Sequence, residues 1–124
     1  MKKITILLLF VVGAFQAQNV DTLFDKANDF YKVEDFKSAI ETYLQIEETG
    51  VASSELYYNL GNVYYKSNKV GPAIYYFEKA LLLDPQNEDV KNNLVFAKRL
   101  AMDNIEELPK RVFQKLNQNL LQKL

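Results

Sequence analysis

The sequence predicts an all-α protein, a short α-solenoid of two helix hairpins followed by a capping helix and a C-terminal amphipathic helix. One pattern of small and aromatic residues occurs twice at a fixed offset of 34 residues. Apolar residues recur with helical period inside each copy, and turn and capping residues lie between these segments. The 124 residues are 48% hydrophobic and 25% charged, which is the composition of a modest globular domain.

Residues 1–17 are predicted to be a signal peptide. Lys2 and Lys3 precede an unbroken apolar run from Ile4 to Val12, and small or polar residues follow up to Ala17. The run is shorter than the roughly 20 residues that a transmembrane helix needs. A buried N-terminal helix and an uncleaved anchor are the alternatives. We expect an exported protein, in the periplasm or at the periplasmic face of the inner membrane if the cell is Gram-negative.

Residues 20–53 and 54–87 are the two copies of the repeat. A shift of 34 residues aligns small with small and aromatic with aromatic positions without a gap: Ala27 with Gly61, Phe30 with Tyr64, Ala39 with Ala73, and Tyr43 with Phe77. Gly61 and Ala73 are expected where the two helices of a hairpin approach closely. Tyr57 and Tyr64 share a helical stripe with Gly61, so they are expected to pack the hairpin.

The second copy resembles a tetratricopeptide repeat. The matching signature positions are Tyr57, in place of the usual Trp, with Leu60, Gly61, Tyr64, Ala73, Phe77, Ala80 and Pro85. Residues 20–53 resemble a degenerate copy, with Ala27, Lys26 and Val51 at the glycine, leucine and proline positions. The resemblance implies stacked helix pairs and a concave groove lined by the first helix of each pair.

Five helices are expected in this part of the chain, at 21–33, 36–48, 54–67, 72–83 and 88–102. Pro72 suits the first position of the fourth helix, where its missing N–H costs little. Asn87 suits the cap of the fifth helix. Residues 88–108 are therefore predicted to be a capping helix and a linker.

Residues 109–124 are predicted to form a separate basic amphipathic helix that begins at Pro109. Its apolar face consists of Val112, Phe113, Leu116, Leu120, Leu121 and Leu124. Three interpretations stay open. The helix packs on the repeats or on its own copy in a dimer, it lies on an anionic membrane surface, or it leads into a sequence not present here.

The residue types argue against an enzyme. The chain has no His and no Cys, which removes the usual zinc, haem and iron–sulfur ligands and the nucleophile pairs that need histidine. Its carboxylates follow helical surfaces without a convergent partner motif. We therefore expect no cofactor, no metal and no catalysis. After removal of residues 1–17, the 13 basic and 16 acidic residues give a net charge of −3, which disfavours nucleic-acid binding.

The predicted groove combines large aromatic side chains with amides, which suit an extended peptide. Its candidates are Tyr58, Asn62 and Tyr65 in the second repeat, Phe24, Asn28 and Tyr31 in the first, Asn92, Phe96 and Arg99 in the capping helix, and Asn59. The alternative is that Tyr58 and Tyr65 only pack against neighbouring helices. Some repeat domains of this family bind chaperone tails through a lysine–asparagine clamp. Asn28 and Asn59 match two of its asparagines, but Phe24, Asp89 and Asn93 stand at its basic positions, so a receptor for a C-terminal carboxylate is not expected.

A narrower resemblance covers essentially the whole chain. A signal peptide, two repeats, the segment from Glu55 to Arg99 and then "IEELPK" are similar to the tetratricopeptide repeat protein of the Bat aerotolerance group. This resemblance implies an envelope component whose partners are von Willebrand factor A-type membrane proteins. Members of that group commonly continue into a membrane segment and a small SH3-like module, which agrees with a chain that is part of a longer protein.

Overall fold

The computed structural model describes residues 19–123, apart from the side chains of 106–109. In this range the chain forms an N-terminal helix over residues 19–32, α2 (Phe36–Glu48), α3 (Ser54–Lys66), α4 (Val70–Leu83) and α5 (Glu88–Leu121), and no strand. The all-α solenoid class is confirmed. The predicted signal peptide, residues 1–17, and Leu124 of the predicted apolar face lie outside the described residues.

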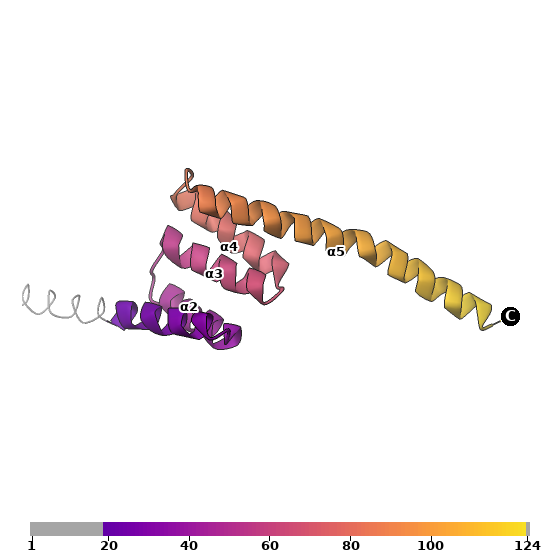
Figure 1. Ribbon diagram of the computed structural model, residues 1–124, viewed down its shortest axis with the longest axis horizontal. Coiled ribbons are helices and arrows are strands. Elements are labelled where there is room, and N and C mark those ends of the chain that lie inside the picture. The colour runs from indigo at the N-terminus through magenta and orange to yellow at the C-terminus, as the bar shows by residue number, and fades with distance from the viewer. Residues whose placement is uncertain (1–18, 124) are drawn as a thin grey trace, which may run out of the picture.

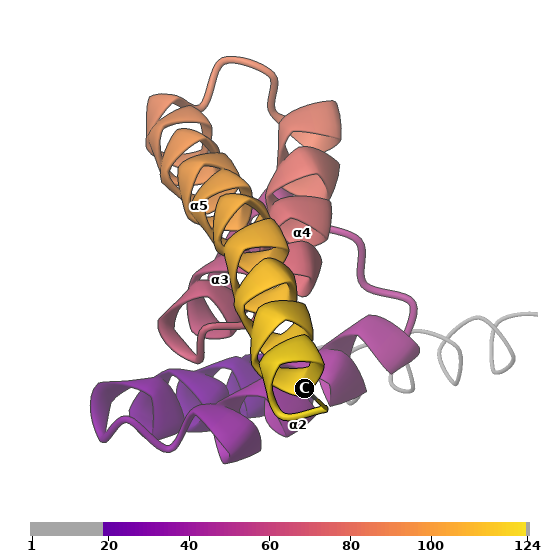
Figure 2. The same cartoon turned by 90° about the vertical axis from the view of Figure 1, so that its right-hand side faces the viewer.

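The helices stack as successive layers. Figure 1 shows the N-terminal helix and α2 as one hairpin, α3 and α4 as the next, and α5 lying over α4. Figure 2 looks along α5 and shows α3 between the first hairpin and the pair of α4 and α5. The first half of α5 therefore caps the second hairpin, while its second half runs past the end of the stack.

The two turns inside the hairpins are equivalent, residue for residue. Glu34 and Asn68, which are 34 positions apart, both adopt left-handed backbone, with φ of 61° and 60°. In each turn the backbone N–H of this residue donates to the carbonyl three positions earlier, and the next N–H donates to the carbonyl five positions before it. These two bonds form a Schellman end for the preceding helix. The repeat seen in the sequence is thus also a repeat of backbone geometry.

Side-chain caps define three of the helix starts. Asp35 accepts a hydrogen bond from the Ser38 N–H at α2, and Ser53 accepts one from the Leu56 N–H at α3. Asn87 accepts one from the Val90 N–H at α5, as its predicted capping role requires. Each cap satisfies a backbone donor that has no partner within its helix.

The core runs continuously through all layers. Its centre is the contact between Gly61 in α3 and Phe77 in α4, both buried. A Cβ atom added at Gly61 would lie 2.5 Å from the Phe77 ring, so only glycine allows this helix spacing. The predicted reason for a small residue at this position is therefore confirmed. The other large, fully buried side chains are Tyr43, Ile46, Leu56, Leu60, Val63 and Val90.

The start of α4 differs from the prediction. The helix begins at Val70 rather than at Pro72, and the turn lies over residues 67–69. Pro72 is therefore the third helical residue instead of the first. The N–H groups of the first three helical positions all lack partners within a helix, so the proline is accommodated equally well there.

The C-terminal segment also differs from the prediction. Instead of a capping helix, a linker and a separate helix from Pro109, α5 is one continuous helix of 34 residues. A proline inside a helix removes one backbone hydrogen bond, which led to the predicted break. The segments on both sides are rich in residues with high helix propensity, so the helix continues through it.

The second half of α5 has little cover. We refer to residues 102–123 as the arm and to the rest of the described chain as the body. The large apolar side chains that the structure describes in the arm are exposed: Met102, Ile105, Val112, Phe113, Leu116, Leu120 and Leu121. None of the helices in the described part of the chain has the length and apolar composition needed to cross a membrane.

Candidate functional site

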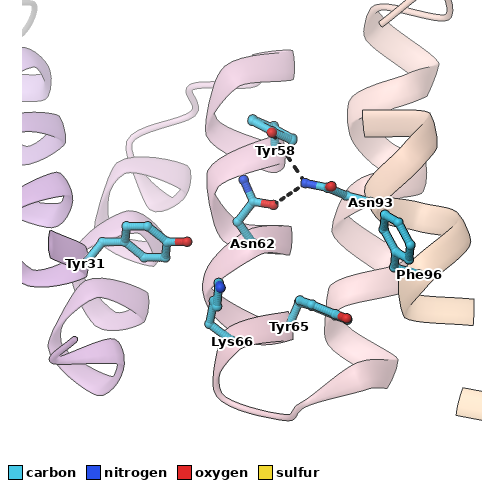
Figure 3. A pocket seen from close by; sticks show the side chains of 7 residues that line it. All are labelled: Tyr31, Tyr58, Asn62, Tyr65, Lys66, Asn93 and Phe96. Carbon is cyan, nitrogen blue, oxygen red and sulfur yellow. Dashed lines mark hydrogen bonds between the residues drawn. The ribbon is translucent and has the colours of Figure 1, made fainter. Parts of the chain in front are cut away.

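A pocket of about 280 Å³ opens across the first helices of the successive pairs. Tyr31 comes from the N-terminal helix, Tyr58, Asn62, Tyr65 and Lys66 come from α3, and Asn93 and Phe96 come from α5 (Figure 3). The solenoid creates this arrangement because it places equivalent helices side by side. The pocket therefore lies on the face where the groove was predicted.

Amide side chains form the floor between α3 and α5. Asn93 Nδ2 donates to Asn62 Oδ1 at 2.8 Å and approaches the Tyr58 hydroxyl at 3.4 Å (Figure 3). Among the described hydrogen bonds, none uses Asn62 Nδ2 or Asn93 Oδ1. Both groups belong to residues that are only half buried. One amide donor and one acceptor therefore remain for a bound backbone.

Tyr58 has a packing role as well as a place in the pocket. Its ring lies against Phe77 of α4, with 6.3 Å between ring centroids. Burial, and next the neighbouring Tyr58, raise the pKa of the Tyr31 hydroxyl above its ordinary value of 10.0. The Tyr31 hydroxyl points from the N-terminal helix toward α3, whereas the Tyr58 hydroxyl lies next to Asn93 of α5 (Figure 3). Tyr58 therefore both lines the pocket and packs against a neighbouring helix, so the two predicted interpretations are not exclusive.

Among the residues whose side chains the structure describes, Lys66 is the one cation that lines the pocket, and no carboxylate lines it. Lys66 is exposed at the rim and is absent from the described ion pairs. A second depression of similar volume adjoins this pocket, because Tyr31 and Lys66 line both; its other walls are Lys32, Glu34 and Phe36. The groove thus continues along the N-terminal helix with a positive rim at Lys66.

The structure places the ten predicted groove residues in two groups. Tyr31, Tyr58, Asn62, Tyr65 and Phe96 line the pocket; Phe24, Asn28, Asn59, Asn92 and Arg99 do not. Phe24 and Asn28 instead contact Tyr43 of α2, through an edge-on ring contact and a hydrogen bond from the tyrosine hydroxyl to Asn28 Oδ1. The long Tyr43 side chain reaches across the first hairpin and covers this part of the N-terminal helix.

Two pocket residues were missed. Asn93, not Asn92, faces the groove, because the buried face of α5 is set by Val90, Leu94 and Ala97. This helical phase was readable from the apolar pattern and would have placed Asn93 beside Phe96. Lys66 follows Asn62 by four residues, so the spacing that predicted Asn62 could also have found it.

The opposite side of α3 carries a second aromatic cluster that joins the repeats. Tyr57 and Tyr64, predicted to pack the hairpin, both lie against Tyr76 of α4, with ring centroids 6.0 Å and 5.6 Å away. The Tyr76 hydroxyl donates to Glu47 Oε2 at 2.8 Å, and Lys79 Nζ donates to Glu47 Oε1 at 3.1 Å. Because Glu47 belongs to α2, these bonds connect the first hairpin to the second.

The environment of Tyr76 favours its neutral form. Burial first, and then the hydrogen bond to Glu47 and the charge of that carboxylate, raise the Tyr76 pKa well above its ordinary value. Lys79 also lies over the Tyr57 ring, 4.2 Å from its centroid. Tyr76, Glu47 and Lys79 are paired with one another inside the repeats, which favours a structural role for this cluster.

The pocket offers the groups that a bound peptide needs. Its tyrosine and phenylalanine rings offer apolar area, the amides offer backbone hydrogen bonds, and Lys66 offers one positive charge. In the described part of the chain, no three His, Cys, Asp or Glu side chains are grouped in a way that holds a metal ion.

Comparison with known families identifies part of the chain. Residues 54–87 match the tetratricopeptide repeat family, over the segment that contains α3 and α4. No curated protein matches this chain.

Proposed function

We propose that this protein, a short all-α solenoid that contains a tetratricopeptide repeat, is a non-enzymatic scaffold that binds a segment of a partner protein in its groove. Repeats of this family form interaction surfaces, which supports protein partners in general. The observation that carries the proposal is the pocket that spans the N-terminal helix, α3 and α5. Its walls come from three stacked layers, so a bound segment would lie across the repeats in an extended form.

The chemistry of the pocket defines the segment that fits. An aromatic or aliphatic side chain would enter between Tyr58, Tyr65 and Phe96, and the free amide atoms of Asn62 and Asn93 would pair with its backbone. An acidic residue nearby would face Lys66. The bound segment is therefore expected to be extended, apolar at its centre and acidic at one flank.

The cellular setting that we propose is the cell envelope, after export by the signal peptide predicted at residues 1–17. The resemblance to the Bat aerotolerance group supports a complex in which the partners are von Willebrand factor A-type membrane proteins. The pattern of charges and apolar residues at the N-terminus supports export.

Affinity capture from detergent-solubilised envelope tests the groove. The double variant Lys66→Glu with Phe96→Ala reverses the charge at the rim and removes one exposed ring, and both side chains project from the helix surface. Its matched control is Lys69→Glu with Val95→Ala. Val95 is exposed on α5, as Phe96 is, and Lys69 is exposed in the turn that follows α3. Neither residue lines the pocket.

The groove variant is expected to lose the partner, identified by mass spectrometry as a von Willebrand factor A-type membrane protein, while the control keeps it. Both variants should keep the wild-type melting temperature. Equal recovery by the two folded variants would refute binding in the groove. The proposed complex would be refuted if the wild type recovered no von Willebrand factor A-type membrane protein and the groove variant lost only an unrelated partner.

A second candidate function uses the arm. The sequence predicted action through this helix, at a membrane surface or by self-association. The observation that favours it is the exposure of every large apolar side chain described in residues 102–123; Phe113, for example, is 72% exposed. Such a surface in a folded protein commonly marks a contact with a membrane or another protein.

A further inference from the structure

Six of the apolar side chains described in the arm lie along one stripe of the helix surface. At about 100° per residue, Met102, Ile105, Val112, Phe113, Leu116 and Leu120 fall within a sector about 100° wide. Over roughly 20 residues at about 1.5 Å each, this stripe is about 30 Å long. Its members are half to three-quarters exposed, so the fold of the body does not cover them.

The end of the arm is also strongly basic. Residues 110–123 carry Lys110, Arg111, Lys115 and Lys123 and no acidic residue. None of the described ion pairs contains the three lysines. The occupant of this surface must therefore satisfy two requirements at once, an apolar contact and negative charge.

For a second copy of this chain, the fit depends on the direction in which the arms pair. Parallel pairing through the stripes covers the apolar side chains but brings the basic ends of both copies together. Antiparallel pairing sets residues 110–123 of one arm beside the segment of the other that carries Asp103, Glu106 and Glu107, so a dimer is a separate outcome of the test below. The first hairpin is acidic, but Val33 is its only large hydrophobic residue that the structure describes as exposed. Docking of the arm there would neutralise charge without covering the stripe.

An anionic lipid surface meets both requirements. Apolar side chains enter the boundary between headgroups and acyl chains, while lysines and arginines contact anionic headgroups. We infer that the arm of α5 lies flat in the surface of an anionic bilayer, with Phe113 and Leu116 inserted and Lys110 and Lys115, on the two flanks of the stripe, among the headgroups. This inference rests on the second candidate function and does not depend on the groove.

The continuous helix also determines where the groove faces. Counting at about 100° per residue, Asn93 and Phe96 lie nearly opposite the centre of the apolar stripe around α5. With the stripe in the bilayer, the groove side of α5 therefore faces away from it. The arm would hold the repeats at the membrane with their binding pocket open to the aqueous phase.

Vesicle flotation of the full chain tests membrane binding. Vesicles of phosphatidylglycerol and phosphatidylethanolamine are compared with vesicles of phosphatidylcholine alone. The variant Phe113→Ser with Leu116→Ser removes the centre of the stripe, and Gln118→Ser with Gln122→Ser changes the opposite face as the matched control. All variants keep the same N-terminus, so any lipid affinity of that segment cancels in the comparison.

The stripe variant is expected to lose about tenfold or more of its partition into anionic vesicles, and the control should bind as the wild type does. Lys110→Gln with Lys115→Gln should lose about fivefold for each positive charge removed, and 0.5 M salt should weaken wild-type binding. Equal flotation of the stripe variant and its control would overturn the inference. Equal binding of the wild type to neutral and anionic vesicles would also overturn it. So would a wild type that forms a dimer, loses the dimer in the stripe variant, and does not float with vesicles.

The absence of cysteine allows the orientation to be tested separately. Single variants Phe113→Cys and Phe96→Cys are labelled with an environment-sensitive fluorophore and mixed with anionic vesicles. A quencher in the lipid phase should reduce the emission of the label at 113, and a quencher dissolved in water should reduce that at 96. Lipid-phase quenching at both positions, or at 96 alone, would overturn the orientation.

Discussion

The body and the arm contain similar apolar side chains in opposite surroundings. Phe77 in the body is fully buried against Gly61, whereas Phe113 in the arm is 72% exposed. The two halves of α5 repeat this contrast within one helix, because Val90 and Ala97 are buried while Met102 and Leu120 are exposed. Helical period alone predicts an apolar face in both regions; only the stacking of layers determines which face is covered.

This difference separates residues that hold the fold from residues that remain available for a partner. In the body, apolar burial supplies most of the stability of a helix that would be marginal alone. In the arm, the same kind of residue contributes little to the folded state. Substitutions should therefore have effects that follow burial rather than residue type.

The largest effect is expected for Phe77→Ala. This change removes a fully buried ring at the centre of the second hairpin and leaves a cavity beside Gly61. The free energy of unfolding should fall by about 3–5 kcal/mol, measured by urea denaturation followed by circular dichroism. A fall below about 1 kcal/mol would mean that α3 and α4 are not packed as described.

Gly61→Ala should have the next largest effect. The added methyl group would overlap the Phe77 ring, and overpacking of this kind costs about 1–3 kcal/mol. Gly71→Ala is the matched control, because a Cβ atom there meets nothing within 4 Å. Combining Gly61→Ala with Phe77→Leu should recover part of the loss, since the smaller side chain makes room. Equal melting temperatures for the two single glycine variants would contradict the close contact.

Tyr76→Phe should have a moderate effect that depends on pH. At neutral pH the variant loses the hydrogen bond to Glu47, at a cost of about 1 kcal/mol. The folded-state pKa of Tyr76 lies above its ordinary value of 10.0, so the folded chain holds this proton more tightly than the unfolded chain. Its contribution is therefore fully present below pH 10.0 and is lost as the pH rises toward the folded-state pKa.

Burial also raises the pKa of Tyr43 to about 12, so the wild type should lose stability above pH 10.0 through more than one tyrosine. Tyr76→Phe should lose less of its stability over the same range. Denaturant titrations at pH 8 and at pH 10.5 to 11 measure this difference. Parallel losses in the two proteins would show that the proton on Tyr76 is not held by the fold.

The smallest effect is expected for Phe113→Ala in the arm. Because this ring is exposed in the folded chain, the free energy of unfolding should change by less than about 0.5 kcal/mol. The comparison with Phe77→Ala uses the same pair of residue types in the two regions. A loss above 1 kcal/mol for Phe113→Ala at low protein concentration would show that the arm packs against the body.

Most of the body could be predicted from the sequence. The offset of 34 residues that the aligned small and aromatic residues define also relates Glu34 to Asn68, which share left-handed backbone, and Gly61 indicated the close approach of two helices. Ser53 and Asn87 are typical capping residues, and they mark the starts of α3 at Ser54 and of α5 at Glu88. These features depend on local chemistry or on a repeated pattern, which a single sequence contains.

The errors arose where distant parts of the chain decide the outcome. The continuity of α5 through Pro109 depends on helix propensity over a long window, against one local breaking signal. Phe24 and Asn28 are covered by Tyr43, and Glu47 pairs with Tyr76 29 positions away. No local pattern indicates which side chain reaches across a hairpin. The choice of Asn92 over Asn93 was an error of helical phase that the apolar pattern could have corrected.

Hydrogen exchange along α5 tests the division between body and arm most directly. Amides of residues 90–101 should be protected in solution, because Val90, Leu94 and Ala97 pack into the core, whereas amides of residues 110–123 should exchange rapidly. Adding anionic vesicles should slow exchange in 110–123 and leave 90–101 unchanged, while neutral vesicles should not. Protection of 110–123 in solution that persists on dilution, or exchange there that anionic vesicles leave unaltered, would contradict the account.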